Sequence, residues 1–190
     1  MIEFGINICH ILKNTHPEIE LTHQTLTLLN DLVKLFIEKI ISVTNQMILR
    51  DGYDCVTIKN VRKAVDKIMV GELKNRAIIK AQRAVISYVI AKRENKQIYP
   101  IEKQKSAGVY FSVNKIETVM MKNAMVNKKE DEAGVYIAGL CEYVITEILD
   151  LTGGAIKNSK KGKIPSRYIV YLIRNDSELS VIYDQFLIED

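Results

Sequence analysis

Two stretches near opposite ends of the chain are the most informative about its fold: residues 9–17, Cys-His-Ile-Leu-Lys-Asn-Thr-His-Pro, and residues 173–179, Ile-Arg-Asn-Asp-Ser-Glu-Leu. The first stretch predicts the end of a short helix over residues 4–14, because Pro17 disfavours helical geometry at the residue before it. The second stretch predicts the end of another helix, with a short extension after Asp176. Between them the chain twice alternates short and long helical patterns.

In the first half, a long helical pattern lies between shorter ones. Thr22 is a suitable N-cap for the long helix, because its hydroxyl can accept a hydrogen bond from a free N–H of the first turn. Apolar residues then recur at i+3 and i+4 spacing for about eight turns, until Asp51-Gly52 ends the helix. A third helix capped by Thr57 and a fourth, amphipathic segment over residues 72–92 follow. The stripe of the long helix consists of Leu28, Leu32, Phe36, Ile40, Val43 and Met47.

The second half repeats this plan. We expect a short helix over residues 113–121, a polar loop over 122–132, a second long helix, and a last helix near Pro165, since proline suits the start of a helix. The apolar stripes of the two later helices consist of Val135, Ala138, Cys141, Val144 or Ile145, Ile148, Leu151 and Ala155, and of Ile169, Leu172 and Ile173.

A long helix flanked by two short ones cannot bury its own apolar stripe. Two such units in one chain can close a common core by pairing with each other. The sequence therefore predicts an all-α fold of two tandem units that pair within the chain. The predicted domains are residues 1–91 and 107–190, joined by a basic, polar linker over residues 92–106.

The composition limits the class of protein. The chain has 190 residues, of which 47% are hydrophobic and 26% charged, which allows a core and argues against wholesale disorder. No apolar run approaches the ~18 residues that would span a membrane, and no secretory signal appears. The three cysteines are odd in number and far apart, which fits reduced thiols, so we expect an intracellular protein. Residues 1–95 contain 14 basic and 10 acidic residues, whereas residues 96–190 contain 13 of each. This mild basicity permits nucleic-acid binding without demonstrating it.

Nothing in the sequence predicts catalysis. The three cysteines are far apart, and the three histidines lie near the N-terminus without a carboxylate at a known metal-ligand spacing. The stretch from Gly154 to Lys163 superficially resembles a phosphate-binding loop, but Lys157 stands where the motif needs a glycine and Ile164 replaces the required Ser/Thr. We therefore expect no enzyme, with no catalytic residue, no metal and no cofactor.

Residues 4–91 resemble core histone 2B and residues 107–179 resemble core histone 2A. The stretch 9–17 resembles the opening helix of histone 2B, and 173–179 resembles the end of the last histone-fold helix of histone 2A. A fused 2B–2A pair is similar to the histone doublets of large DNA viruses of the marseillevirus group. The other matching positions include Pro17, Asn30, Glu38, Ala64-Val65, Gly71-Glu72-Leu73, Ala107-Gly108, Phe111, Glu142-Tyr143, Glu147-Ile148-Leu149, Gly153 and Arg167.

This resemblance implies a histone-fold heterodimer in one chain and a structural role in DNA packaging. It implies that the chain docks on a histone 3–4-type doublet and wraps double-stranded DNA without sequence specificity in a nucleosome-like particle. Such a particle would lie in chromatin, in a viral factory, in the host nucleus or in the virion. The positions that match the family's DNA contacts are Thr22, His23, Tyr53, Cys55, Thr57, Lys115, Lys122, Lys128, Lys160, Lys161 and Lys163.

Several residues at the implied DNA surface depart from the family. Tyr53-Asp54 stand where the family carries Arg-Ser, Lys128 and Lys163 stand at arginine positions, and Glu130-Asp131-Glu132 adjoin a loop expected to contact phosphate. We therefore expect weaker and more salt-sensitive DNA binding than that of a cellular histone dimer. The chain also has no long basic tail and no docking segment after its last helix, so we expect a weaker hold on the histone 3–4 doublet.

The histone resemblance also implies an acidic patch on the face opposite the DNA surface. This patch would bind partners that insert an arginine into it. Ser177 and Lys80 replace two of the family's carboxylates there. An ordinary solvated helix face is the plain alternative for such a run of charge. The alternative function is a histone-fold interaction module that recruits chromatin or transcription partners through this face, with weak DNA wrapping. The patch residues are Glu72, Glu142, Glu147, Asp150, Asp176 and Glu178.

Overall fold

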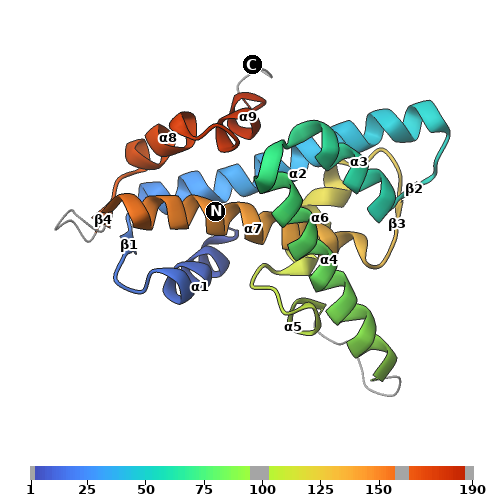
Figure 1. Cartoon of the computed structure of the whole chain (residues 1–190). Helices are drawn as coiled ribbons and strands as arrows, with labels where there is room; N and C mark the ends of the chain where they lie inside the picture. The colour runs from blue at the N-terminus through green and yellow to red at the C-terminus, as the bar shows by residue number, and fades with distance from the viewer. Residues whose placement is uncertain (1–2, 95–102, 157–162, 187–190) are drawn as a thin grey trace.

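Helices make up most of the regular structure in the computed structural model, which describes residues 3–94, 103–156 and 163–186. Two long helices, α2 and α7, run side by side through the centre, and the shorter elements surround them (Figure 1). The first half contains α1 (Gly5–Thr15), β1 (Glu20–Leu21), α2 (His23–Asp51), β2 (Cys55–Val56), α3 (Ile58–Ile68) and α4 (Gly71–Glu94). The second contains α5 (Lys103–Ala107), α6 (Val113–Asn123), β3 (Lys128–Lys129), α7 (Ala133–Ile156), β4 (Lys163–Ile164), α8 (Ser166–Asn175) and α9 (Leu179–Asp184).

The predicted helix caps are present. The side chain of Thr22 accepts a hydrogen bond from the Thr25 backbone N–H, and that of Thr57 accepts one from Asn60. Gly52 adopts the left-handed conformation at the end of α2, with φ of 69°. These local signals fix where α2 begins and ends and where α3 begins, as the sequence predicts.

The two halves share one core. Ile37, Ile40 and Ile41 of α2 are completely buried, as are Val135 and Leu140 of α7, and all belong to one continuous apolar cluster. The stripes of the two long helices therefore cover each other. The prediction of two tandem units paired within one chain is confirmed.

Two short parallel strand pairs join the halves at opposite ends of the long helices. Strand β1 pairs with β4, with Glu20 opposite Lys163, and β2 pairs with β3, with Cys55 opposite Lys128. Each strand has only two residues, which is too short for an alternating pattern to be visible in sequence. These pairs bring the loop after a short helix in one half beside the loop after the long helix in the other.

Some element limits differ from the sequence prediction. Helix α4 extends to Glu94, and α5 begins at Lys103, so both enter the predicted linker 92–106. The expected polar loop over residues 122–132 includes the end of α6 and strand β3. The division into domains remains a prediction. Within the described parts of the chain, no helix combines the length and apolar character needed to cross a membrane.

Candidate nucleic-acid interface and acidic surface

At the β1–β4 end, two helices start side by side. The paired strands lead directly into α2, which Thr22 caps, and into α8, where Pro165 holds the N-cap position. His23 is exposed in the first turn of α2. Lys163 is 73% exposed, and its Nζ lies 3.9 Å from Glu20. Helix N-termini and an exposed lysine together favour a bound anion such as a phosphate.

At the β2–β3 end, the corresponding lysine is already paired. Lys128 Nζ lies 2.6 Å from Asp54 Oδ2, and this hydrogen bond raises the pKa of Lys128 and lowers that of Asp54. The carboxylate of Glu130 accepts a hydrogen bond from the Ile58 N–H, 2.8 Å away, at the start of α3. Carboxylates of the chain itself therefore occupy positions that a phosphate would take.

The other predicted contacts at this end lie close together in the structure. Thr57 caps α3, and Tyr53 is 44% exposed in the turn before β2. Cys55 is half-buried in β2, and burial raises the pKa of its thiol. Cys55 and Thr57 therefore belong to the strand pairing and the helix start, where their contribution to anion binding would come mainly from backbone and hydroxyl groups.

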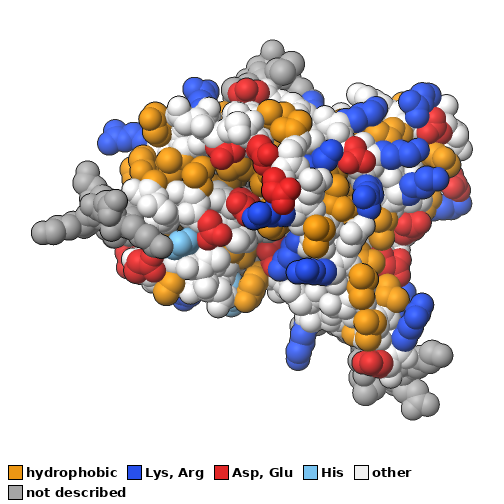
Figure 2. All heavy atoms as spheres, in the orientation of Figure 1, with side chains coloured by type: hydrophobic (Ala, Val, Ile, Leu, Met, Phe, Trp, Pro, Cys, Tyr) orange, Lys and Arg blue, Asp and Glu red, His pale blue; other side chains and the backbone are white. Residues whose placement is uncertain are grey.

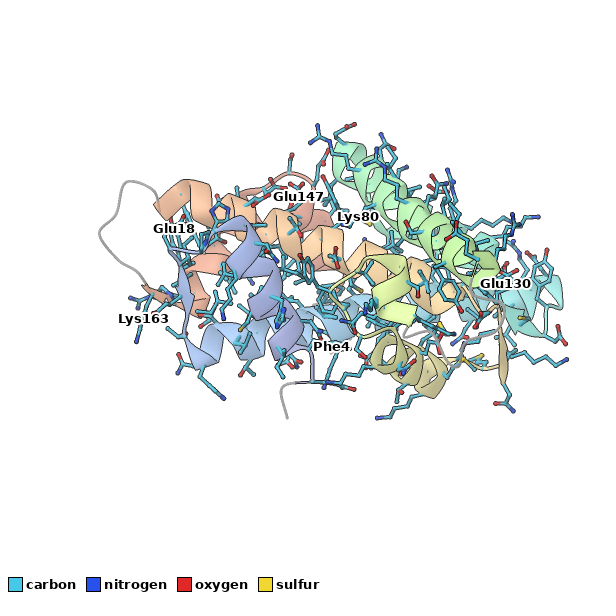
Figure 3. The ribbon with its side chains drawn as sticks, turned by 90° about the horizontal axis from the view of Figure 1, so that it is seen from below. Phe4, Glu18, Lys80, Glu130, Glu147 and Lys163 are labelled. Carbon is cyan, nitrogen blue, oxygen red and sulfur yellow. The ribbon has the colours of Figure 1, made fainter. Side chains whose placement is uncertain are left out.

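The starts of α1 and α6 meet between the two ends. Phe4 and Phe111, which precede these helices, contact edge to face with ring centroids 5.6 Å apart. Lys115 on α6 donates to the Glu3 carbonyl at 2.8 Å, and Lys122 is exposed near the end of α6. In Figure 3, Lys163 and Glu130 lie toward opposite ends of the molecule with Phe4 between them.

Two of the predicted DNA contacts cannot be placed. Lys160 and Lys161 lie outside the described residues. The remaining predicted positions fall into three groups. At the β1–β4 end lie Thr22, His23 and Lys163; on α6 lie Lys115 and Lys122; and at the β2–β3 end lie Tyr53, Cys55, Thr57 and Lys128.

Four of the predicted acidic residues surround an open hollow of about 290 Å³ between α4, α7 and the start of α9. Acidic side chains gather near α9 and the start of α4 on the face shown in Figure 2. Arg76 also lines the hollow, and its Nε lies 3.0 Å from Glu72 Oε1. This hydrogen bond lowers the pKa of the Glu72 carboxyl. The four carboxylates are Glu72, Glu147, Asp176 and Glu178.

Glu178 also has a structural role. Its two carboxylate oxygens accept hydrogen bonds from the backbone N–H groups of Glu72 and Leu73, at 2.8 and 2.7 Å. A carboxylate at this position satisfies free N–H groups and complements the dipole of α4. Gly71, with φ of 64°, leaves room for it, since a Cβ there would collide with the Glu178 side chain.

Glu142 is not part of the exposed acidic surface, contrary to the sequence prediction. Its side chain is only 3% exposed, its Oε1 lies 2.9 Å from Lys80 Nζ, and its other oxygen accepts from the Tyr110 N–H. Lys80, one of the two substitutions at a family carboxylate, therefore neutralises a buried charge. Asp150 lies apart from the hollow, where its carboxylate is 2.9 Å from the His16 ring.

A charge cluster beside the predicted linker was not predicted. Lys103 Nζ lies 2.6 Å from Asp131 and 2.8 Å from Glu117, and Asp131 also pairs with Lys92 and with the Tyr88 hydroxyl. Burial and the bond to Asp131 raise the pKa of Tyr88 to about 12. The cluster ties α4 of the first half to α5, α6 and the residues before α7.

The comparisons with known proteins agree with this architecture. A histone doublet of Melbournevirus that joins histones 2B and 2A is 25% identical over 181 residues, which are 95% of this chain and 65% of that protein. Histone 2A of Euphorbia esula is 34% identical over 80 residues, and a probable histone 2A of Oryza sativa subsp. indica is 35% identical over 80. Each plant match covers 42% of this chain.

The chain is a tandem pair of histone folds. The similarity to the doublet extends over nearly the whole chain, and the structure pairs the two halves around one core. The first half is the histone 2B-like half and the second is the histone 2A-like half. The chain spans 65% of the doublet and about half of the plant histones it matches. No model of a known protein family matches the chain. Within the described residues, no group of His, Cys, Asp and Glu side chains could hold a metal ion.

Proposed function

We propose that this histone doublet packages double-stranded DNA without reading its sequence. The observation that carries the proposal is the pairing of β1 with β4, which sets the starts of two helices and the exposed Lys163 side by side. Free N–H groups and a lysine bind backbone phosphates of any sequence. The similarity to the Melbournevirus histone doublet supports the same role.

The two strand-paired ends contribute unequally to this binding. At the β1–β4 end, Lys163 is only loosely paired with an exposed carboxylate. At the β2–β3 end, Asp54 and Glu130 neutralise Lys128 and cover the start of α3. We therefore propose that DNA is held mainly at the β1–β4 end and along α6, with a weaker hold at the other end.

The partner in packaging is a histone 3–4-type doublet, because a histone 2B–2A pair is one half of the protein set that wraps DNA. The expected particle is nucleosome-like, with DNA contacts to the backbone and to the minor groove. Weak contacts at the β2–β3 end would leave the DNA at that end more accessible to nuclease.

The test is reconstitution. The chain is mixed with a histone 3–4-type doublet and DNA of about 150 bp, and the product is digested with micrococcal nuclease. A discrete protected fragment, longer than that given by the histone 3–4-type doublet alone, is the expected result. Protection identical to that of the doublet alone would contradict the packaging proposal. A parallel titration of the chain on DNA at several salt concentrations gives the number of phosphates contacted.

A second candidate function is supported by the acidic hollow. Glu72, Glu147, Asp176 and Glu178 would bind a partner's arginine, and Arg76 lies where it competes for the same carboxylates. In this interaction-module function, the chain recruits chromatin or transcription partners and wraps little DNA. An arginine-anchored peptide should bind more tightly to the Arg76→Ala variant than to the wild type. No binding to either protein would remove this candidate.

A further inference from the structure

The outward face of α4 carries an apolar row that the histone pairing does not use. Ile79, Ile86 and Ile90 are 46%, 58% and 49% exposed. Their spacing of seven and four residues places the three side chains within about 40° of one another around the helix. Single exposed apolar residues are common on proteins, but an aligned row on one helix face marks an interaction surface.

Arginines alternate with this row. Arg83 and Arg93 are exposed on the same side of α4, between and beyond the isoleucines. Within the described parts of the chain, neither guanidinium has an ion-pair or hydrogen-bond partner. Two neighbouring lysines of α4 are already neutralised, since Lys80 pairs with Glu142 and Lys92 pairs with Asp131.

The opposite face of α4 is buried against the rest of the molecule, so α4 cannot rotate to bury the isoleucine row instead. Leu73, Ala77, Ala81, Ala84 and Tyr88 are buried, and α4 packs against α7 and α5 along this face. Beyond that contact, α4 projects from the body of the molecule (Figure 1). Figure 2 shows hydrophobic side chains in a row along the projecting part, with basic side chains beside them.

We propose that this face of α4 binds an acidic amphipathic helix of a partner protein. Apolar side chains of the partner pack against Ile79, Ile86 and Ile90, and its carboxylates pair with Arg83 and Arg93. The length of the row, about 17 Å over the twelve residues from Ile79 to Ile90, matches about three turns of a bound helix. An unpaired arginine can bind a carboxylate with two parallel hydrogen bonds, which gives this surface its selectivity for acidic partners.

The charges and the width of the row disfavour other occupants. A second copy of the chain would bring two further arginines, rather than carboxylates, from its own row to the contact. DNA would leave the isoleucines against phosphates, where they gain no apolar contact. A membrane-surface helix has a broad apolar face, whereas this row is one side chain wide and is bordered by Gln82 and Ser87.

The test uses the whole chain and a synthetic helical peptide of about 18 residues, long enough for about five turns. The peptide carries leucines at i, i+3, i+4 and i+7 spacing, with glutamates on both flanks, and its binding is followed by fluorescence anisotropy. We expect Ile86→Ser/Ile90→Ser and Arg83→Glu/Arg93→Glu each to weaken binding at least about tenfold, which is 1.4 kcal/mol. A peptide with lysines in place of the glutamates should bind the Arg83→Glu/Arg93→Glu variant more tightly than the wild type.

Matched controls separate this surface from others. Leu49→Ser removes an isoleucine-sized exposed side chain from α2, and Lys122→Glu reverses an exposed charge on α6, so neither should change binding. Equal binding by the wild type and both α4 variants would overturn the proposal. So would row-dependent binding to phosphatidylserine vesicles in place of the peptide, or row-dependent self-association in sedimentation. These outcomes do not depend on DNA binding, which is tested separately.

Discussion

The backbone of Gly139 in α7 packs directly against the backbone of Ala81 in α4. A Cβ at residue 139 would lie 2.7 Å from the Ala81 Cα, which is closer than such atoms approach in proteins. This contact allows α4 of the histone 2B-like half to lie against the long helix of the histone 2A-like half. It is therefore part of what holds the two halves together.

Replacing this glycine should weaken the fold. We expect Gly139→Ala to lower the free energy of unfolding by about 1–3 kcal/mol, because neither backbone can yield without moving a whole helix. Urea denaturation followed by circular dichroism measures the change. Gly154→Ala in the same helix is the matched control, since a Cβ there meets nothing within 4 Å. The control should be neutral or stabilising, because alanine favours helix more than glycine does. Equal losses in both variants would contradict the importance of the contact.

The carboxylate of Glu178 should be required for the stability of α4. We expect Glu178→Ala to cost about 1–2 kcal/mol, because two N–H groups at the start of α4 lose their acceptor and the helix loses a favourable charge. Glu178→Gln should cost less, since the amide oxygen can still accept one of the bonds. Thermal unfolding and hydrogen exchange at Glu72 and Leu73 report the effect. Glu38→Gln, an exposed carboxylate on α2, serves as the control.

The sequence predicts most of the helices because each leaves a repeated local signal. The stripe from Leu28 to Met47, the cap Thr22 and the turn at Gly52 act over a few residues, and all appear in the structure as expected. The histone resemblance adds the pairing of the halves, which periodicity alone only suggests. The strand pairs were missed because two residues show no alternation.

The functions of individual carboxylates could not be predicted in the same way. Glu142 and Glu178 look alike in sequence, as acidic residues at family positions, yet one is buried against Lys80 and the other caps α4. Both roles depend on residues more than 60 positions away in the chain. The charge cluster around Asp131 is also invisible locally, because its partners come from α4, α5 and α6.

Asp131 should make the stability of the chain sensitive to acid. Burial opposes its charge, but hydrogen bonds from Lys103, Lys92 and Tyr88 hold its pKa well below the ordinary value near 3.9. The charged form is thus favoured in the folded state. Its contribution is fully present above about pH 5, where the carboxyl is ionised in the unfolded state too, and is lost as pH falls toward the folded pKa.

We therefore expect the difference in unfolding free energy between wild type and Asp131→Asn to be about 1 kcal/mol at pH 7, because the group is partly exposed. The difference should stay constant down to about pH 5 and shrink at pH 3. Urea denaturation at each pH gives both values, with Glu38→Gln as the reference for an exposed carboxylate. A difference that grows as pH falls would contradict this account.

Removing the carboxylates at the β2–β3 end should strengthen DNA binding. In the variant Asp54→Asn/Glu130→Gln, Lys128 loses its partner, and the start of α3 loses the anion that covers it. Each phosphate contact regained at an exposed, screened site strengthens binding only modestly, so we expect an affinity gain of about three- to tenfold. The salt dependence should also steepen, because a newly freed lysine releases a further counterion from DNA.

The measurement is a titration of the chain on a short DNA duplex at several salt concentrations, followed by fluorescence anisotropy. Glu20→Gln at the other end is the matched control. Its carboxylate lies 3.9 Å from Lys163 and both side chains are more than 70% exposed, so its removal should change the affinity less. An equal gain from Glu20→Gln would mean that net charge alone sets the affinity. No gain from the double variant would mean that DNA does not contact the β2–β3 end. No DNA binding by any variant would instead contradict the packaging proposal itself.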